Sequence, residues 1–181
     1  MEVVLMVVYE NPWFRVMRED GFHFVDEPTS KQGAAVLPLV GNSLWLLQMH
    51  RPAQKMAMTL EVPRGYAHEG ETSRRCAARE LQEEMGLSID PRSLQYLGKV
   101  RPNTAIMTAC IDLYVARFHG DVVVGQRDRE ASGLASIPLE RLPIWLGEGH
   151  VQDGFTLAAL SYYFAAQRIT AAASQVTTPV A

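Results

Sequence analysis

One strongly helical segment lies in the middle of this 181-residue chain, with strand-like runs on both sides. Thr72 or Ser73 can cap its N-terminus, and Gly86 stands where a helix end favours a positive φ. Short alternating or apolar runs, rich in β-branched and aromatic residues, precede and follow it. We expect strands near 3–9, 13–18, 22–26, 34–40, 44–49, 59–62, 94–100, 109–118, 122–124 and 134–137.

The order of these elements constrains the fold class. A last helix is expected from about Gly154 to Arg168, capped by Asp153, and a short helical turn is expected at 139–142. Strands do not alternate regularly with helices, and neither G-x-G-x-x-G nor a Walker A sequence occurs. The sequence therefore predicts an α+β sandwich, with a mixed sheet between helices, rather than a doubly wound sheet. Extra antiparallel strands precede it, and Asp20-Gly21 is typical of a hairpin turn between two of them.

We expect three parts in the chain: strands at 1–32, a main domain at 33–170 and a flexible tail at 171–181. The 17 Lys and Arg residues against 20 Asp and Glu residues give no basic excess, so no nucleic acid is expected as a partner. The apolar N-terminus is too short to span a bilayer and has no basic leader. The two cysteines, Cys76 and Cys110, are typical of free thiols in a reducing compartment. We therefore expect a cytoplasmic protein with no membrane partner.

The central helix carries an unusual acidic face. At about 100° per residue, Glu80, Glu83 and Glu84 fall within an arc of roughly 100°, beside an apolar stripe, with Arg79 on the far side. Like charges so spaced destabilise a helix, and a divalent cation would remove that penalty. Glutamates alone are nevertheless more typical of a solvated acidic face.

The spacing of residues around this face is more specific. The chain reads Gly65-x5-Glu71-x7-Arg79-Glu80-Leu81-x-Glu83-Glu84-x-Gly86-Leu87, which matches the Nudix box at every defined position. The chain thus resembles the Nudix hydrolases, over roughly residues 33–168. The resemblance implies an α/β/α Nudix sandwich and Mg²⁺ as cofactor, with Mn²⁺ as a substitute. It also implies that Glu80, Glu83 and Glu84 hold the metal, that Arg79 orients one of them, and that water attacks a phosphorus.

Residues outside the box resemble the ADP-ribose pyrophosphatase branch of the family. Pro102 lies fifteen residues after the box leucine, as in that branch. The resemblance implies a phosphate contact for Arg51, a place near the metals for Glu61, and a catalytic base in the loop containing Glu130, with Asp128 as the second candidate. The branch usually has a small residue where this chain has Arg64, which we expect either to contact phosphate, to alter the nucleotide pocket, or to be a solvated loop residue.

The resemblance implies a small-molecule substrate, ADP-ribose or another ADP-sugar, cut to a nucleoside monophosphate and a sugar phosphate. Other ADP-linked compounds, dinucleotides and GDP-sugars are alternatives, whereas nucleoside triphosphates and capped RNA fit less well. A catalytically silent ligand-sensing Nudix module is a different class, but such modules typically lose box glutamates. Members of the branch commonly form homodimers through an N-terminal sheet, so residues 1–32 are expected to serve dimerisation or substrate contact.

Overall fold

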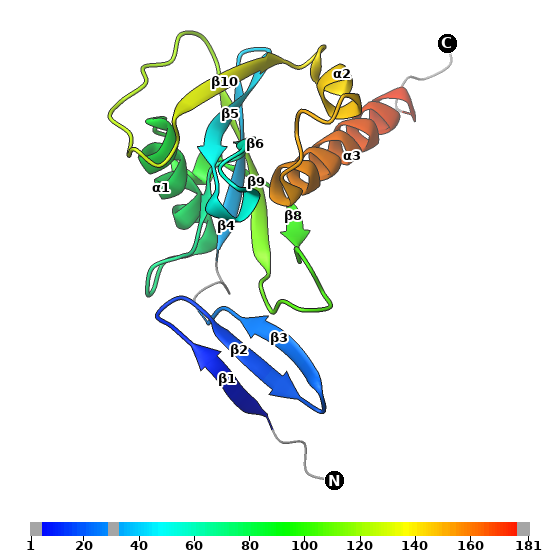
Figure 1. The fold of residues 1–181 in the computed structure, drawn as a ribbon. Helices are drawn as coiled ribbons and strands as arrows, with labels where there is room; N and C mark the ends of the chain where they lie inside the picture. Colours follow the sequence, from blue (N-terminus) through cyan, green and yellow to red (C-terminus); the bar gives the residue numbers. More distant parts are fainter. Residues whose placement is uncertain (1–4, 29–32, 177–181) are drawn as a thin grey trace.

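The computed structural model describes residues 5–28 and 33–176, which form two β-sheets and three helices (Figure 1). The first sheet is antiparallel, in the order β1-β2-β3, with β1 at Met6–Glu10, β2 at Arg15–Glu19 and β3 at Phe22–Asp26. Asp20 and Gly21 connect β2 to β3 with φ values of 46° and 87°. Two consecutive positive φ values are typical of a tight hairpin turn, so the predicted turn is confirmed.

The second sheet has seven strands and is mixed. Its main order is β10-β5-β4-β9-β8, with β6 beside β5 and β7 beside β4. The β4–β9 pair is parallel and the other pairs are antiparallel. The strands are β4 (Ala34–Val40), β5 (Ser43–His50), β6 (Met58–Glu61), β7 (Arg64–Gly65), β8 (Gln95–Val100), β9 (Ile111–Phe118) and β10 (Gly133–Pro138).

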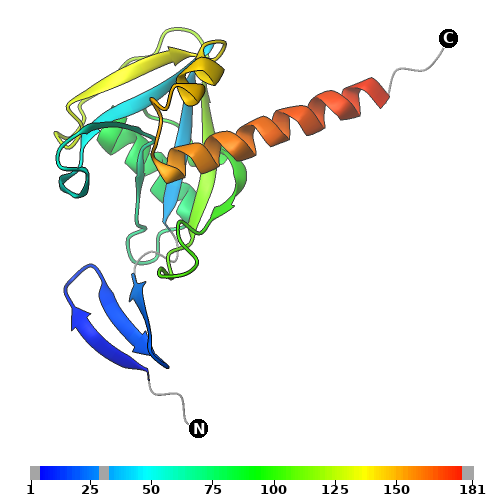
Figure 2. The same ribbon diagram turned by 45° about the vertical axis from the view of Figure 1, so that its right-hand side comes forward.

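Helices cover both faces of this mixed sheet (Figure 2). Alternate residues of β4 divide between two cores: Ala34 and Val36 pack with α1 (Ser73–Met85), and Ala35 and Leu37 pack with α3 (Gly154–Val176). Helix α2 (Leu142–Gly147) adds to the α3 side, and 3-10 turns lie at Pro52–Gln54 (η2) and Pro91–Ser93 (η3). The predicted α+β sandwich is confirmed, because a strand buried on both faces needs a helix layer on each.

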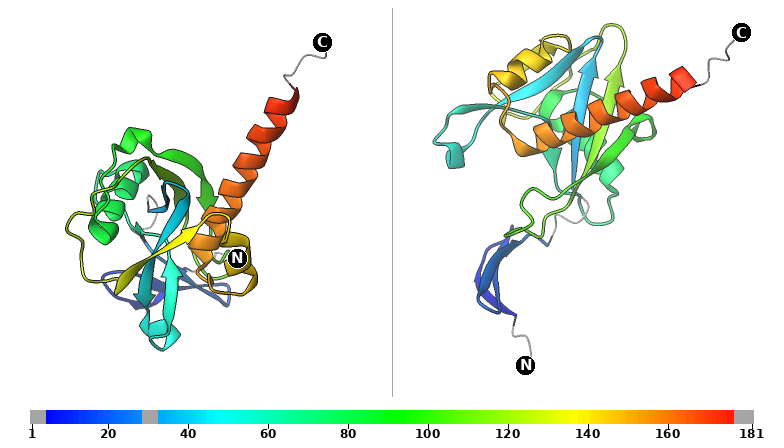
Figure 3. Two further views of the ribbon diagram at one scale, coloured as in Figure 1. Left: turned by 90° about the horizontal axis from the view of Figure 1, so that it is seen from above. Right: turned by 90° about the vertical axis from the view of Figure 1, so that its right-hand side faces the viewer.

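The N-terminal sheet joins the rest of the chain through the connection between β8 and β9. Val25 N–H donates to the Ile106 carbonyl at 2.7 Å, and Thr108 N–H donates to the Val25 carbonyl at 3.0 Å. Met17 is its one buried side chain among the described residues, and the sheet stands apart from the sandwich in Figure 1 and in the right panel of Figure 3. These hydrogen bonds therefore fix the sheet to the sandwich without giving it an apolar core of its own.

Three predicted elements differ from the structure. Residues 122–124 form no strand, because Gly125 N–H donates to the Gly86 carbonyl at 2.8 Å and ties the β9–β10 connection to the end of α1. The helical turn expected at 139–142 begins only at Leu142. The last helix continues past Arg168 to Val176 and projects from the body (Figure 3), since its alanine-rich end favours helix.

Residues 3–4 of the strand predicted at 3–9 lie outside the described residues, as do residues 177–181 of the tail predicted at 171–181. No helix within the described part of the chain is both long and apolar enough to cross a membrane.

Candidate active site

Helix α1 has the ends that its sequence predicts. The Thr72 side chain accepts from the Arg75 N–H, and Gly86, with φ 70°, donates its N–H to the Gln82 carbonyl at 2.9 Å. Leu81 and Met85 are fully buried against the sheet. Burial of this stripe fixes the rotation of the helix and directs the glutamates to one edge of the sandwich.

Arg79 is the centre of the box. Its Nη1 donates to Glu80 at 2.6 Å and to Glu83 at 2.9 Å, while Nε and Nη2 donate to Glu71 at 3.2 and 3.0 Å. Nη2 also donates to the Tyr66 carbonyl. Helical periodicity predicts Arg79 on the far side from the glutamates, and this is wrong for its guanidinium, because the long side chain reaches back across the helix. It orients two box glutamates and ties the loop before the helix to them.

Glu84 and Glu80 are buried carboxylates. The Glu84 side chain is 6 % exposed and accepts from the Arg64 N–H at 3.0 Å. Burial, together with the charges of Glu80 and Glu130, raises the pKa of Glu84 to about 8. Burial also raises the pKa of Glu80, although Arg79 opposes that shift. Both groups would therefore gain from a nearby cation.

Gly65 has a spatial role in this arrangement. A Cβ atom at this position would lie 2.0 Å from Glu80 Oε1, well inside contact distance. Gly65 lies in strand β7, paired with Ala34. The glycine is required because the Glu80 carboxylate occupies the space of a side chain.

A divalent metal fits these residues chemically. Carboxylate oxygens are the hard ligands that Mg²⁺ prefers, and among the described residues no cationic side chain neutralises the buried Glu84 as Arg79 does for Glu80. Within residues 5–28 and 33–176, no three His, Cys, Asp or Glu side chains already converge as a metal-binding group. Arg79 draws Glu80 and Glu83 toward itself, so metal binding would require these side chains to rearrange.

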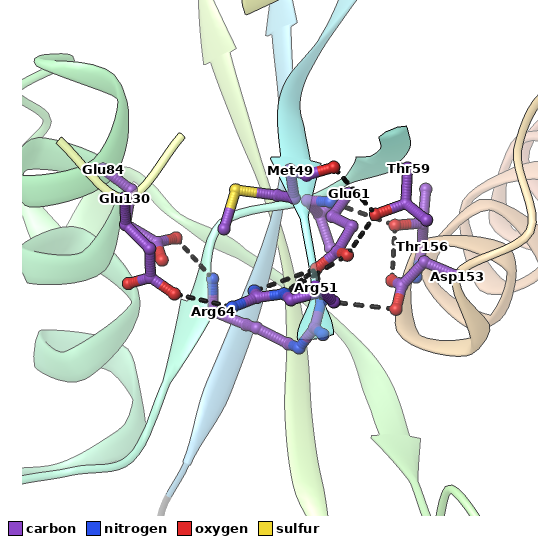
Figure 4. Close-up of polar contacts among 10 residues, drawn as sticks. Met49, Arg51, Thr59, Glu61, Arg64, Glu84, Glu130, Asp153 and Thr156 are labelled. Atoms are coloured by element: carbon purple, nitrogen blue, oxygen red, sulfur yellow. Dashed lines mark hydrogen bonds and ion pairs between the residues drawn. The ribbon is translucent and has the colours of Figure 1, made fainter. Parts of the chain in front are cut away.

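A second polar cluster lies between Glu84 of α1 and the start of α3 (Figure 4). Arg51 donates from Nε and Nη2 to Glu61 Oε2 at 3.2 and 3.0 Å, and from Nη1 to Glu130 Oε1 at 2.6 Å. Thr59 Oγ1 donates to the other Glu61 oxygen at 2.6 Å. Burial alone would raise the pKa of Glu61, but the bonds from Arg51 and Thr59 and the charge of Arg64 outweigh it, so the pKa lies below its ordinary value. Glu61 is therefore a fixed anion at neutral pH.

Arg64 lies beside this cluster and is no solvated loop residue. Its Nη1 lies 3.0 Å from Glu61 Oε2 and 3.3 Å from Asp153 Oδ1, and its guanidinium lies 4.7 Å from the centre of the Phe155 ring. Asp153 also caps α3, as predicted, by accepting from the N–H and hydroxyl of Thr156 at 2.9 and 2.7 Å. The sequence suggested only this capping role, because nothing local shows that residues 64 and 153 meet.

Two cavities meet at the arginines. One, of about 230 Å³, is lined by aromatic and apolar groups with the two arginines: Ala34, Arg51, Arg64, Gly65, Tyr66, Ile111 and Phe155. The other, of about 380 Å³, is mostly polar: Arg51, Ala53, Gln54, Thr59, Glu61, Arg64, Gln152, Asp153 and Gly154. Arg51 and Arg64 are the only residues common to these two linings. The cleft thus has an aromatic compartment, a polar compartment and two cations at their junction.

The remaining predicted residues lie outside the linings of these two cavities. Glu130 is exposed, and its N–H donates to Asp128 Oδ1 at 3.0 Å, while Asp128 N–H donates to the Glu83 carbonyl at 2.7 Å. Asp128 therefore holds the Glu130 loop against α1. Pro102 lies exposed in the β8–β9 connection and is not among the residues that line either cavity.

Comparisons with known proteins agree with this geometry. A family model described as NUDIX domain matches residues 29–157. Among solved structures, the chain is similar to that of an ADP compounds hydrolase, with a TM-score of 0.74 and 17 % sequence identity over 93 % of this chain and 95 % of that chain. No curated protein matches the sequence at a significant level. The family match confirms the resemblance predicted from the box, and the structural match confirms the fold.

Proposed function

The chain belongs to the Nudix domain family, and on this premise we propose that it hydrolyses the diphosphate bond of a nucleoside diphosphate linked to another moiety. The observation that carries the proposal is the complete box beside a two-part cleft: Arg79 orients Glu80 and Glu83, and Glu84 is buried next to them. A silent ligand-sensing module would not need three retained glutamates, two of them buried at a desolvation cost that a metal cation would offset.

The cleft supports an ADP-sugar as substrate, with ADP-ribose as the first choice. The compartment with Tyr66 and Phe155 suits a flat base, and the polar compartment suits a hydroxylated sugar. The positive charge at the junction of the two compartments suits a diphosphate. The similar solved structure is that of an ADP compounds hydrolase, which favours an adenine nucleotide.

Glu80, Glu83 and Glu84 are proposed to hold Mg²⁺, for which Mn²⁺ could substitute. The metal would supply charge neutralisation on the phosphoryl oxygens and acidify the attacking water. Arg79 orients Glu80 and Glu83, and Glu130 is the proposed base that takes the proton from the water. Glu130 accepts a hydrogen bond from Arg51, and we propose that it exchanges this partner for the attacking water.

The exposed N-terminal sheet supports a homodimer. Its apolar side chains are largely uncovered, including Val7, Tyr9, Trp13 and Phe22, each at 48 % exposure or more. A three-stranded sheet with one buried residue gains stability when a second layer covers it. We propose that residues 1–32 form the dimer contact and that the main domain is catalytic. The free cysteines, Cys76 and Cys110, support a cytoplasmic location.

Purified protein should be incubated with Mg²⁺ and ADP-ribose, other ADP-sugars, GDP-sugars, dinucleotides and nucleoside triphosphates, with product identification by chromatography. We expect AMP and a sugar phosphate from ADP-ribose, and no reaction in EDTA. Preference for a GDP-sugar or a dinucleotide would replace the ADP-sugar assignment with that rival. Absence of monophosphate from every substrate would refute hydrolysis and leave the sensing module.

A further inference from the structure

The two arginines of the cleft differ in how their nitrogens are used. Arg51 donates hydrogen bonds from Nε, Nη1 and Nη2, and every one of them ends on Glu61 or Glu130. Arg64 Nη1 lies 3.0 Å from a Glu61 oxygen and 3.3 Å from an Asp153 oxygen, and these contacts are ion pairs without a hydrogen bond. The Arg64 guanidinium makes no side-chain hydrogen bond with any residue in the described part of the chain.

The Arg64 side chain is nevertheless held in place. Its guanidinium lies over the Phe155 ring, and Glu61 and Asp153 attract Nη1 from β6 and from the start of α3. An arginine fixed by stacking and by ion pairs loses little further freedom when it binds a ligand. Because Arg64 borders both cavities, its unused donors are available where the two compartments meet.

The backbone of Arg64 links this position to the acidic helix. Its N–H donates to Glu84, and the next residue, Gly65, makes room for Glu80. Arg64 thus contacts the acidic helix with its backbone and borders both cavities with its side chain. Hydrolysis requires the substrate phosphates to lie between the bound substrate and the carboxylates proposed to hold the metal.

We infer that the phosphate contact belongs to Arg64, whereas Arg51 is a positioning residue that holds Glu61 and Glu130. The sequence resemblance implied a phosphate contact for Arg51. The inference deepens the proposed function and rests on it for the identity of the substrate. It makes Arg64, in place of the small residue usual at this position, a determinant of affinity for the diphosphate.

The test compares Arg64→Gln with the wild type by calorimetric titration in EDTA, where no turnover occurs. Two probes carry phosphate, ADP-ribose and inorganic pyrophosphate, and adenosine is the probe without phosphate. Loss of a charge-assisted hydrogen bond should weaken binding of both phosphate probes by about 10- to 100-fold and leave adenosine unchanged. With Mg²⁺, KM should rise by a similar factor while kcat changes little.

Two further variants separate binding from folding. Arg64→Lys keeps the charge and should lose less affinity than Arg64→Gln, and Arg51→Lys should lower kcat more than it raises KM. Glu61 and Asp153 keep Arg51, Thr59 and Thr156 as partners after the Arg64 change, so the fold should persist. Arg92→Gln is the matched control, since Arg92 is exposed on η3 and pairs only with Asp90 there.

Unchanged phosphate-probe binding in Arg64→Gln would overturn the inference, as would equal weakening of adenosine or a wild type that binds neither phosphate probe. If the wild type binds ADP-ribose through Arg64 but hydrolyses nothing with Mg²⁺, the proposed function fails and the inference about Arg64 stands. If the wild type hydrolyses ADP-ribose with no effect of Arg64→Gln, only the inference fails.

Discussion

Glu84→Gln should stabilise the metal-free protein at alkaline pH while it abolishes most of the activity. Glu84 is almost fully buried, its pKa is raised from 4.5 to about 8 by burial, and in the unfolded chain it returns to its ordinary value. As pH rises through this interval the unfolded chain releases a proton that the folded chain keeps. The free energy of unfolding therefore falls between about pH 4.5 and pH 8, and the loss is complete above that range.

The magnitude follows from the size of the shift. One pKa unit corresponds to about 1.4 kcal/mol, so the full shift sets a limit on the order of 5 kcal/mol. Neighbouring acids titrate together with Glu84, so we expect about 1–3 kcal/mol of this loss. Glutamine has the same shape, carries no charge and keeps an oxygen for the Arg64 N–H. At pH 8.5 in EDTA, Glu84→Gln should therefore raise the melting temperature by roughly 2–10 °C.

Thermal unfolding of both proteins should be followed at pH 5.5 and pH 8.5, with EDTA and with Mg²⁺. At pH 5.5 the difference between the two melting temperatures should be about a third of that at pH 8.5, and Mg²⁺ at pH 8.5 should stabilise the wild type more than the variant. Turnover of ADP-ribose should fall by roughly 100-fold or more, since metal stabilisation of the transition state is worth several kcal/mol. A variant no more stable than the wild type at pH 8.5 in EDTA would refute the claim that the buried, ionised Glu84 destabilises the fold when no cation is bound.

Three other changes test separate parts of the structure. Gly65→Ala places a Cβ 2.0 Å from Glu80 Oε1. The value of kcat/KM with Mg²⁺ should therefore drop about tenfold or more, and the free energy of unfolding should fall by about 1–3 kcal/mol. Normal activity would mean that Glu80 has no fixed position. Thr72→Ala removes the N-terminal cap of α1. It should lower the free energy of unfolding in urea by about 1 kcal/mol without changing kcat, and an unchanged free energy of unfolding would contradict the capping role. Trp13→Ser on the exposed sheet should shift sedimentation toward the monomer, whereas an unchanged mass would place the dimer contact elsewhere.

Local sequence patterns determine much of this fold. Short apolar or alternating runs predict β3 and β4 at their observed bounds, and the ends of α1 follow from Thr72 and Gly86. These features depend on residues within a few positions of one another, so a linear sequence contains them. The strand predicted at 122–124 is wrong for the same reason, because a local run of valines says nothing about whether a neighbouring strand exists.

The residues of the site also differ in whether local or long-range contacts place them. The sequence by itself determined the acidic face of α1, with Glu80, Glu83 and Glu84 at helical spacing and Arg79 at a fixed offset. Only the tertiary structure brought Arg51 to Glu130, which are separated by 79 positions, and Arg64 to Asp153 at the start of α3. Those contacts depend on how β5, β7 and α3 pack around one sheet, and packing is a property of the whole chain rather than of any segment.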